Sequence, residues 1–170
     1  MKIKFIDTGH KDFFLSMQDN ASIWDCYHKA LFYTLGICPD CRKNISQLFD
    51  FKENCIKVEG LQFGWHTSGS IAVCRLAFNL WNDYMGEDPN NFTVSNLFCS
   101  EYAPFMWQGI RLRYPELCAE ERLQITDEDG HAIQENISSK IIAESYVTIY
   151  EREGQGKYKI EPMPDIILDI

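Results

Sequence analysis

One segment of the chain is apolar on almost every side. Residues 68–85 read SGSIAVCRLAFNLWNDYM, and the apolar positions from Val73 to Trp81 leave little room for a polar face. A helix that is hydrophobic all round has to be surrounded by other elements. We therefore expect this segment to form a central helix, with Ser68 as its N-cap, in a mainly helical domain.

The segments before it predict further helices. Residues 8–19 follow Asp7, which stands three residues before His10, as an N-cap residue stands before the N3 residue. The next segment, SIWDCYHKALFYTL, has apolar residues at helical spacing and is followed by Gly36. A glycine in that place is typical of the residue that closes a helix.

The pair of cysteines in CPDC admits three interpretations. Cys38 and Cys41 supply only two of the four ligands of a structural zinc site. A thioredoxin-like redox pair would follow a β-strand, whereas the preceding segment has helical periodicity. Pro39 favours the first turn of a helix with Cys38 as its N-cap. We therefore expect a helix start, and neither a metal nor a cofactor.

The periodicity changes near residue 120. The segment TVSNLFCSEYAPFMWQGIRLRY is helical in pattern, with a kink or break at Pro104 and an end at Pro115. Residues 122–134 and 146–161 each read as two strands joined by a turn, which predicts two hairpins. The predicted fold class is α+β, with a mainly helical core of about five helices and a C-terminal antiparallel β-hairpin extension.

The predicted domains differ in charge. We expect a helical domain over residues 1–118 and an acidic, β-rich extension over residues 119–170. The chain has a net charge of -9, and residues 116–170 carry 13 acids against 5 bases, while residues 1–115 carry 12 against 11. Such an extension would repel a phosphate backbone and attract a basic protein surface. Direct nucleic-acid binding is therefore not expected.

Composition also suggests a location. No run of the sequence is long and charge-free enough to span a bilayer, so no membrane association is expected. The seven cysteines are odd in number and lie in apolar stretches, where a reduced cysteine acts as a small hydrophobic residue. These features predict free thiols and a cytoplasmic protein.

Two groups of residues are candidates for a catalytic or anion-binding site. Asp7 and His10 could form a general base held by a carboxylate, or two metal ligands one turn apart. Their capping position favours an N-cap pair instead. Ser68, Gly69 and Ser70 could offer backbone N–H groups to an anion at a helix N-terminus, helped by Arg75. The segment lacks the spacing and the lysine of a phosphate-binding loop.

His66 and Arg75 complete the set of candidate site residues. His66 precedes the TSGS segment, where it could act on a bound anion. Arg75 lies one helical turn before Asn79 in the nearly all-apolar segment, and a buried arginine needs acceptors around it. It therefore either organises a polar network in the core or lines a cleft, and the core network is the expected role, because structural networks are more common than functional ones. The acidic segment TDEDGHA lacks the closing glutamate of a calcium loop and reads as a turn.

Several stretches carry a resemblance to a known family. They read TLGICPD, LFDFKENCIKVEGLQFGWHTS, RLAFNLWND and FCSEYAPFMWQGIRLRYPE. Over residues 5–117 the chain resembles a family of small bacterial proteins, frequent on phages and other mobile elements, that is catalogued as a domain of unknown function. Asp7, His10 and Phe13 also resemble the opening of that family.

The resemblance implies no established reaction. The occurrence of that family on mobile elements suggests accessory roles, including interference with host defence systems. The chain departs from the family pattern at Cys41, where threonine is usual, and at His66, where glutamine is usual. Both departures weaken the case for metal or histidine chemistry at these positions.

The sequence supports three hypotheses of function. In the preferred one, the acidic extension docks on a protein partner. The protein could then be a defence inhibitor of the anti-CRISPR type, whose acidic surface occupies the basic nucleic-acid channel of that partner. The alternative is a small hydrolase or nuclease that uses His10 or His66 with Asp7 and Arg75, which requires these residues to share one cleft. The third is a self-assembling protein, which a continuous exposed patch formed by Trp24, Trp65 and Trp107 would support.

Overall fold

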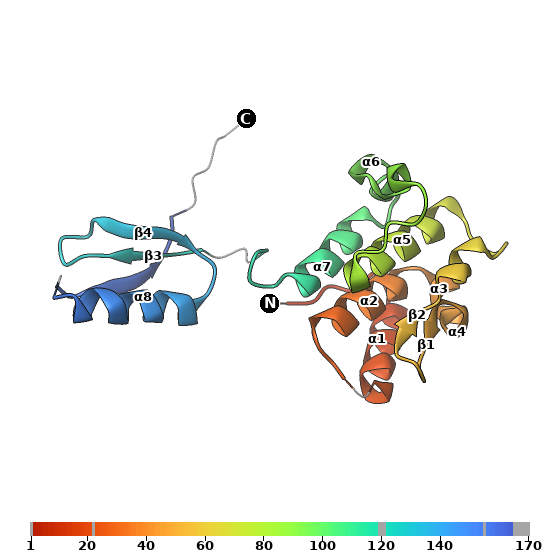
Figure 1. The fold of residues 1–170 in the computed structure, drawn as a ribbon, viewed down its shortest axis with the longest axis horizontal. Coiled ribbons are helices and arrows are strands. Elements are labelled where there is room, and N and C mark those ends of the chain that lie inside the picture. Colours follow the sequence, from red (N-terminus) through yellow and green to blue (C-terminus); the bar gives the residue numbers. More distant parts are fainter. Residues whose placement is uncertain (1, 22, 119–121, 155, 165–170) are drawn as a thin grey trace. The chain divides into compact units, whose positions relative to one another are not determined.

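The structure is a computed structural model that describes residues 2–21, 23–118, 122–154 and 156–164. It confirms the predicted α+β class, with a mainly helical part followed by a C-terminal antiparallel sheet of three strands (Figure 1). The chain divides into two compact units, Met1–Tyr114 and Pro115–Ile170, which we describe separately. In the described residues no helix is long and apolar enough to cross a membrane.

The first unit is built around two helices that pack on each other. Helix α2 (Cys26–Ile37) is buried almost throughout, and it also contacts α1, α3 and α7. Helix α5 (Ser68–Asn82) packs on α2, α3, α6 and α7, as its apolar sequence predicted. The remaining elements are α1 (Thr8–Asn20), α3 (Pro39–Lys43), α4 (Ile45–Leu48), α6 (Val94–Leu97), α7 (Ala103–Arg113), the 3-10 helices η1 (Val58–Gln62) and η2 (Pro89–Phe92), and the short ribbon of β1 (Phe49–Asp50) with β2 (Cys55–Ile56).

The helix starts were partly predicted. Asp7 caps α1 and Cys38 precedes α3 with Pro39 in its first turn, as expected. The N-cap of α5 is Thr67 rather than Ser68, because Thr67 and the N3 residue Ser70 form a reciprocal capping box. Pro104 lies in the first turn of α7, so the predicted helical segment is broken between α6 and α7, as one of the two expectations for Pro104 had it.

Gly36 does not end α2, which continues to Ile37. A Cβ atom at Gly36 would lie 2.6 Å from Cδ2 of His10 and 2.9 Å from Cδ1 of Phe13. The glycine is therefore required by the close approach of α1 to α2, and its position near the helix end misled the local prediction.

The second unit is a three-stranded antiparallel sheet with one helix packed on it. The strands β3 (Leu123–Thr126), β4 (Ala132–Ile137) and β5 (Lys159–Pro162) lie in the order β4-β3-β5, with Ile125 of β3 paired to Gln134 and to Ile160. Helix α8 (Lys140–Arg152) contacts all three strands. The first predicted hairpin is thus confirmed as β3 and β4.

The second predicted hairpin is wrong. Its first strand is part of α8, and only its second strand exists, as β5. The alternation of Val147 and Ile149 suggested a strand, but Ala143, Val147 and Tyr150 recur at helical spacing and pack on the sheet. Burial of this face against Ile125 stabilises a helix despite its β-branched residues.

Candidate functional site

The helical unit contains a cavity of about 550 Å³ between η1, α5 and the loop that follows α5. This volume is within the range of small-molecule sites. Its wall combines the aromatic rings of Tyr84 and Phe92 with aliphatic side chains. The polar residues that line it are Glu59, Gln62, Arg75, Glu87, Asp88 and Asn91.

The loop from Asp83 to Phe92 forms one wall of this cavity. Asp83 ends α5 in the left-handed conformation, with φ of 61°. The side-chain amide of Asn79 donates to the carbonyl oxygen of Tyr84 at 3.2 Å, and the ring of Tyr84 packs edge-to-face on that of Phe92. These contacts return the chain toward the α5 face that carries Arg75.

Arg75 is the cation of the cavity wall. Its side chain is half-buried and, among the described residues, makes no hydrogen bond or ion pair. The carboxylates of Glu59 and Glu87 also lack such partners in the described part of the chain. Asp88 is engaged by its own turn, where it accepts from the backbone and side-chain amides of Asn90. The wall therefore holds one cation and three acids without an ion pair between them.

His66 lies near Arg75 but does not line the cavity. Its Nε2 donates to the carbonyl oxygen of Gly60 at 2.9 Å, and its Nδ1 lies 3.1 Å from Oγ of Ser70. Burial and the positive charge of Arg75 lower the pKa of His66. The imidazole is therefore held neutral with both nitrogens bonded.

The predicted anion-binding residues at the start of α5 are occupied by the helix itself. Ser70 is buried, and its hydroxyl accepts from the backbone N–H of Thr67 at 2.8 Å. A Cβ at Gly69 would lie 3.1 Å from the ring of Tyr102, while Ser68 is exposed. Of this predicted group, Arg75 alone lines the cavity.

Asp7 and His10 join α1 to neighbouring elements. His10 is fully buried, its Nε2 donates to the carbonyl oxygen of Tyr33 at 2.8 Å, and its Nδ1 accepts from the backbone N–H of Ile6. Burial lowers the pKa of His10 to about 4. Asp7 accepts from the backbone N–H of His10 and pairs with Arg42 at 3.1 Å. The structure therefore does not bring His10, His66 and Arg75 into one cleft.

A second aspartate–histidine pair repeats this spacing and was missed by the sequence analysis. Asp25 caps α2, and its Oδ1 lies 2.7 Å from Nδ1 of His28. The Nε2 of His28 lies 3.0 Å from Oδ1 of Asn54, which links α2 to the turn between β1 and β2. The signal was available in the sequence, because DTGH and DCYH share an aspartate three residues before a histidine.

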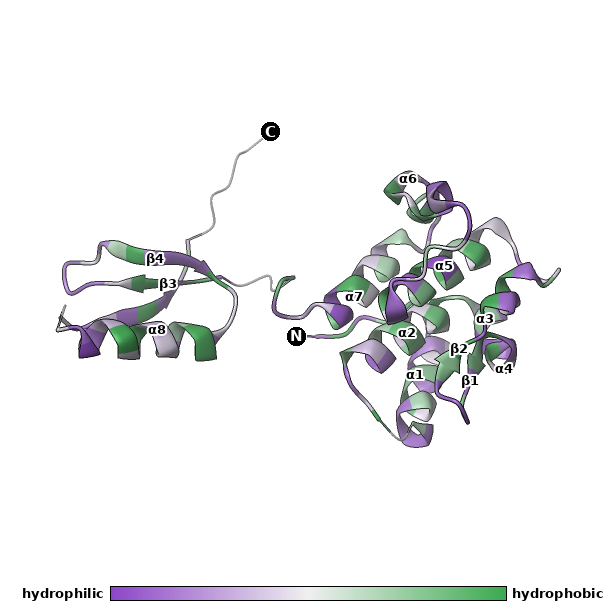
Figure 2. Ribbon diagram, viewed as in Figure 1, coloured by the Kyte–Doolittle hydropathy of each residue, from purple (hydrophilic) through white to green (hydrophobic). Residues whose placement is uncertain are grey.

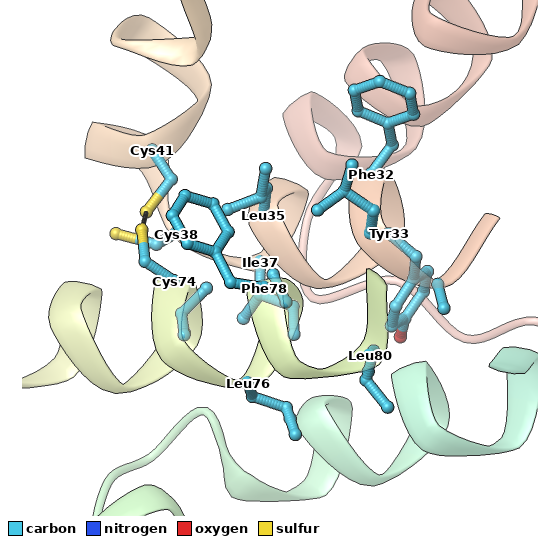
Figure 3. Close-up of a cluster of buried hydrophobic side chains, with 14 of the residues drawn as sticks. Phe32, Tyr33, Leu35, Ile37, Cys38, Cys41, Cys74, Leu76, Phe78 and Leu80 are labelled. Carbon is cyan, nitrogen blue, oxygen red and sulfur yellow. Dashed lines mark hydrogen bonds between the residues drawn. The ribbon is translucent and has the colours of Figure 1, made fainter. Parts of the chain in front are cut away.

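Three cysteines gather inside the helical unit (Figure 3). The sulfur atoms of Cys41 and Cys74 lie 3.4 Å apart, and Cys38 is buried beside them. A hydrogen bond with Cys41, together with burial, raises the pKa of the Cys38 thiol, and the pKa of Cys41 is raised as well. Because the thiolate is the reactive form, these residues serve packing rather than nucleophilic chemistry.

Among the described residues, three side chains in the turn between β3 and β4 lie close enough together to be considered as metal ligands. One ligand atom from each of Asp127, Asp129 and His131 lies within 4.8 Å of the others. However, Asp127 already accepts from the backbone N–H groups of Asp129 and His131 at 3.0 and 2.8 Å. Its carboxylate thus closes the turn that the sequence predicted, and the cluster carries no metal assignment.

Helix α8 contains several hydrophobic residues (Figure 2), and some of their side chains are exposed. We define the α8 stripe as Ile142, Tyr146 and Ile149, whose side chains are 38 to 48% exposed. Ile141 is 75% exposed and lies outside this stripe, about 100° around the helix from Ile142. The stripe is thus a distinct surface beside the face that packs on the sheet.

The tryptophan patch required for the self-assembly hypothesis is not formed. Trp24 packs on Phe14 and Phe32, and Trp65 donates from Nε1 to the side chain of Gln47 at 3.0 Å. Trp107 is the exposed member of the three predicted residues.

The family comparison matches residues 1–126 to the model of a family of unknown function, DUF6075. The chain belongs to this family. The DUF6075 match extends on both sides of the resemblance seen over residues 5–117, and it includes the cavity and all of β3. No curated protein and no solved structure matches the chain.

Proposed function

We propose that this protein acts by binding a protein partner through its acidic C-terminal unit. The observation that carries the proposal is the α8 stripe, because Ile142, Tyr146 and Ile149 follow one another at helical spacing and remain exposed. Large apolar side chains grouped on one helical face are typical of an interaction surface.

The stripe lies beside the face of α8 that packs on its own sheet. The face of α8 that packs on the sheet consists of Ala143, Val147 and Tyr150, one position further along the helix in each case. This neighbouring face supplies the contacts with Ile125 and Ile137. The exposed residues of the stripe are therefore free to contact another molecule.

Charge supports a basic partner. The residues from 116 to 170 have 13 acids and 5 bases, and exposed acids of the described part include Glu128, Asp129, Glu144 and Glu151. An apolar stripe with acidic surroundings complements an apolar groove with a basic rim. A nucleic-acid-binding channel has such a basic rim, and an inhibitor of the anti-CRISPR type would bind there.

The same proposal describes a cytoplasmic accessory protein of a phage or another mobile element. The mobile-element setting comes from the resemblance noted in the sequence, and the cytoplasmic location is supported by seven free cysteines. Direct binding to nucleic acid is not part of the proposal, because the acidic unit would repel phosphates.

A small hydrolase or nuclease is the less favoured function. It would use His10 or His66 with Arg75, and the cavity at Arg75 supports it. However, neither histidine lines that cavity, and both ring nitrogens of each are bonded elsewhere.

The proposal is tested by capture of partners from a nuclease-treated bacterial lysate with three forms of the full chain. These are the unchanged protein, the triple variant I142S/Y146S/I149S and the control variant I141S, which removes an exposed isoleucine outside the stripe. We expect basic proteins that bind the unchanged protein and I141S, are lost with the triple variant, and dissociate as salt is raised. Equal capture by the triple variant would contradict the proposal.

The inhibitor form of the proposal has its own assay. The protein is added to a purified CRISPR effector loaded with its guide, and cleavage of target DNA is measured. Inhibition by the unchanged protein and by I141S, but not by the triple variant, is the expected result. Unchanged cleavage would exclude this effector as the partner.

A further inference from the structure

The cavity is lined by residues of the helical unit, whereas the residues of the proposed partner surface belong to the other unit. Arg75 is half-buried in its wall without a hydrogen-bonding or ionic partner among the described residues. A guanidinium that is partly removed from water loses hydration, and this loss is best offset by a bidentate anion. The arrangement therefore favours a ligand that carries an acidic group.

The acids of the wall restrict what that ligand can be. Glu59 enters from η1 and Glu87 from the loop after α5, so carboxylates stand on two sides of the cavity that Arg75 lines. With Asp88 the lining has three acids and one base. A dianion such as phosphate would meet more repulsion than attraction, whereas a ligand with one anionic and one or more cationic groups would be complementary.

The remaining wall fits the hydrocarbon part of such a ligand. The rings of Tyr84 and Phe92 can contact methylene groups or the face of a guanidinium, and Gln62 and Asn91 can exchange hydrogen bonds with amides. The volume of about 550 Å³ leaves room for a free amino acid with a long side chain or for a dipeptide.

We propose that the cavity binds a small zwitterion, namely a basic amino acid or a short peptide ending in one. Its carboxylate pairs with Arg75, and its cationic side chain pairs with Glu59 and Glu87. This ligand supplies Arg75, Glu59 and Glu87 with the ionic partners that the described part of the protein does not provide.

The test is isothermal titration calorimetry on the full chain with four probes. L-Arginine and glycyl-L-arginine carry both charges, agmatine is arginine without the carboxylate, and inorganic phosphate is a simple anion. We expect the two zwitterions to bind at least about tenfold more tightly than agmatine, because agmatine cannot pair with Arg75. Binding of phosphate alone, or of agmatine as tightly as arginine, would overturn the proposal.

Variants locate the site. Arg75→Met and the double variant E59Q/E87Q should each weaken arginine binding about tenfold or more. The control Lys52→Met removes a 90% exposed cation outside the cavity and should change the affinity for arginine by less than about twofold. Glu59 and Glu87 are exposed, so the double variant reports on binding even if Arg75→Met does not fold. Unchanged binding in the double variant would contradict the proposed site, as would an absence of zwitterion binding at about 10 mM.

A second readout comes from His66. Its ring lies close enough to Arg75 for that charge to influence it, while both ring nitrogens bond to protein atoms. Binding of a carboxylate to Arg75 should therefore shift the NMR signals of the His66 ring in the unchanged protein. The ring signals of His28, which does not line the cavity and is bonded to Asp25 and Asn54, should not move.

Discussion

His10 donates a hydrogen bond from Nε2 to the carbonyl oxygen of Tyr33 at 2.8 Å, across the boundary between α1 and α2. The ring is also packed against Tyr33, with the centroids 4.5 Å apart, and it fills the space beside Gly36. A residue that could be a general base is thus a neutral link between two helices. Four predictions follow from this packing, from the cap of α5 and from the buried thiols.

Gly36→Ala should destabilise the protein. Alanine is favoured over glycine in a helix by about 1 kcal/mol, but its methyl group would overlap the rings of His10 and Phe13. Overpacking of a core typically costs about 1–3 kcal/mol, and the gain in helix propensity offsets about 1 kcal/mol of it, so we expect a net loss of up to about 2 kcal/mol in urea unfolding. Gly64→Ala is the control, because a Cβ there has open space. Without the clash, alanine would stabilise the helix, so a Gly36→Ala protein more stable than the unchanged one would disprove the close packing.

Protonation of His10 should weaken the fold in mild acid. Its pKa is about 4 in the folded state against an ordinary value of 6.5, so the unfolded state binds more protons between these values. The stabilisation is complete above pH 6.5 and is lost as the pH falls toward 4. Urea unfolding of the unchanged protein and of His10→Gln, measured from pH 7.5 to 4, tests this.

The stability difference between these two proteins should shrink as the pH falls, because glutamine cannot take up a proton. The comparison also removes the contribution of His66, whose pKa is lowered as well and which is present in both. A difference that stays constant with pH would show that His10 does not titrate between the folded and unfolded states.

Thr67→Ala should cost about 1 kcal/mol, because it removes the side-chain acceptor for the N–H of Ser70. Ser68→Ala, one residue further, should change the free energy of unfolding by less than about 0.5 kcal/mol, since that side chain is exposed. The order would be reversed if Ser68 were the cap. Thermal unfolding of both variants decides between the two assignments.

Alkylation should distinguish the cysteines by position. Cys55 and Cys99 are exposed and should react with iodoacetamide in the native protein, whereas Cys38, Cys41 and Cys74 are buried and should react only after unfolding. Mass spectrometry of peptides after brief labelling measures each site. Fast labelling of Cys38 or Cys41 in the folded protein would revive a redox or metal role for CPDC.

Local signals predicted much of the fold. The caps at Asp7 and Cys38, the hairpin around the acidic turn and the apolar α5 all depend on residues close in sequence. Gly36 was misread because its reason is contact with α1, which no local pattern contains. The α8 segment was misread because its β-branched residues favour a strand until the sheet buries one face of a helix.

The candidate site was less accessible to prediction. Arg75 stood out as a charged residue in an apolar helix, but we expected a core network, whereas it lines a cavity without a hydrogen bond or ion pair among the described residues. This outcome depends on the loop from Asp83 to Phe92 and on η1, which approach α5 only in the folded chain. The positions of Glu59 and Glu87 in the same wall had no sequence signal at all.

The order of the strands determines where a truncated form of the protein can end without exposing the edges of the sheet. The DUF6075 match ends at residue 126, with the last residue of β3, and β3 is the middle strand of the β4-β3-β5 sheet. A polypeptide cut at that point would keep the centre of a sheet while losing both neighbours and the helix that covers it. An isolated strand with two open edges invites aggregation, so a truncated form should end near Tyr114.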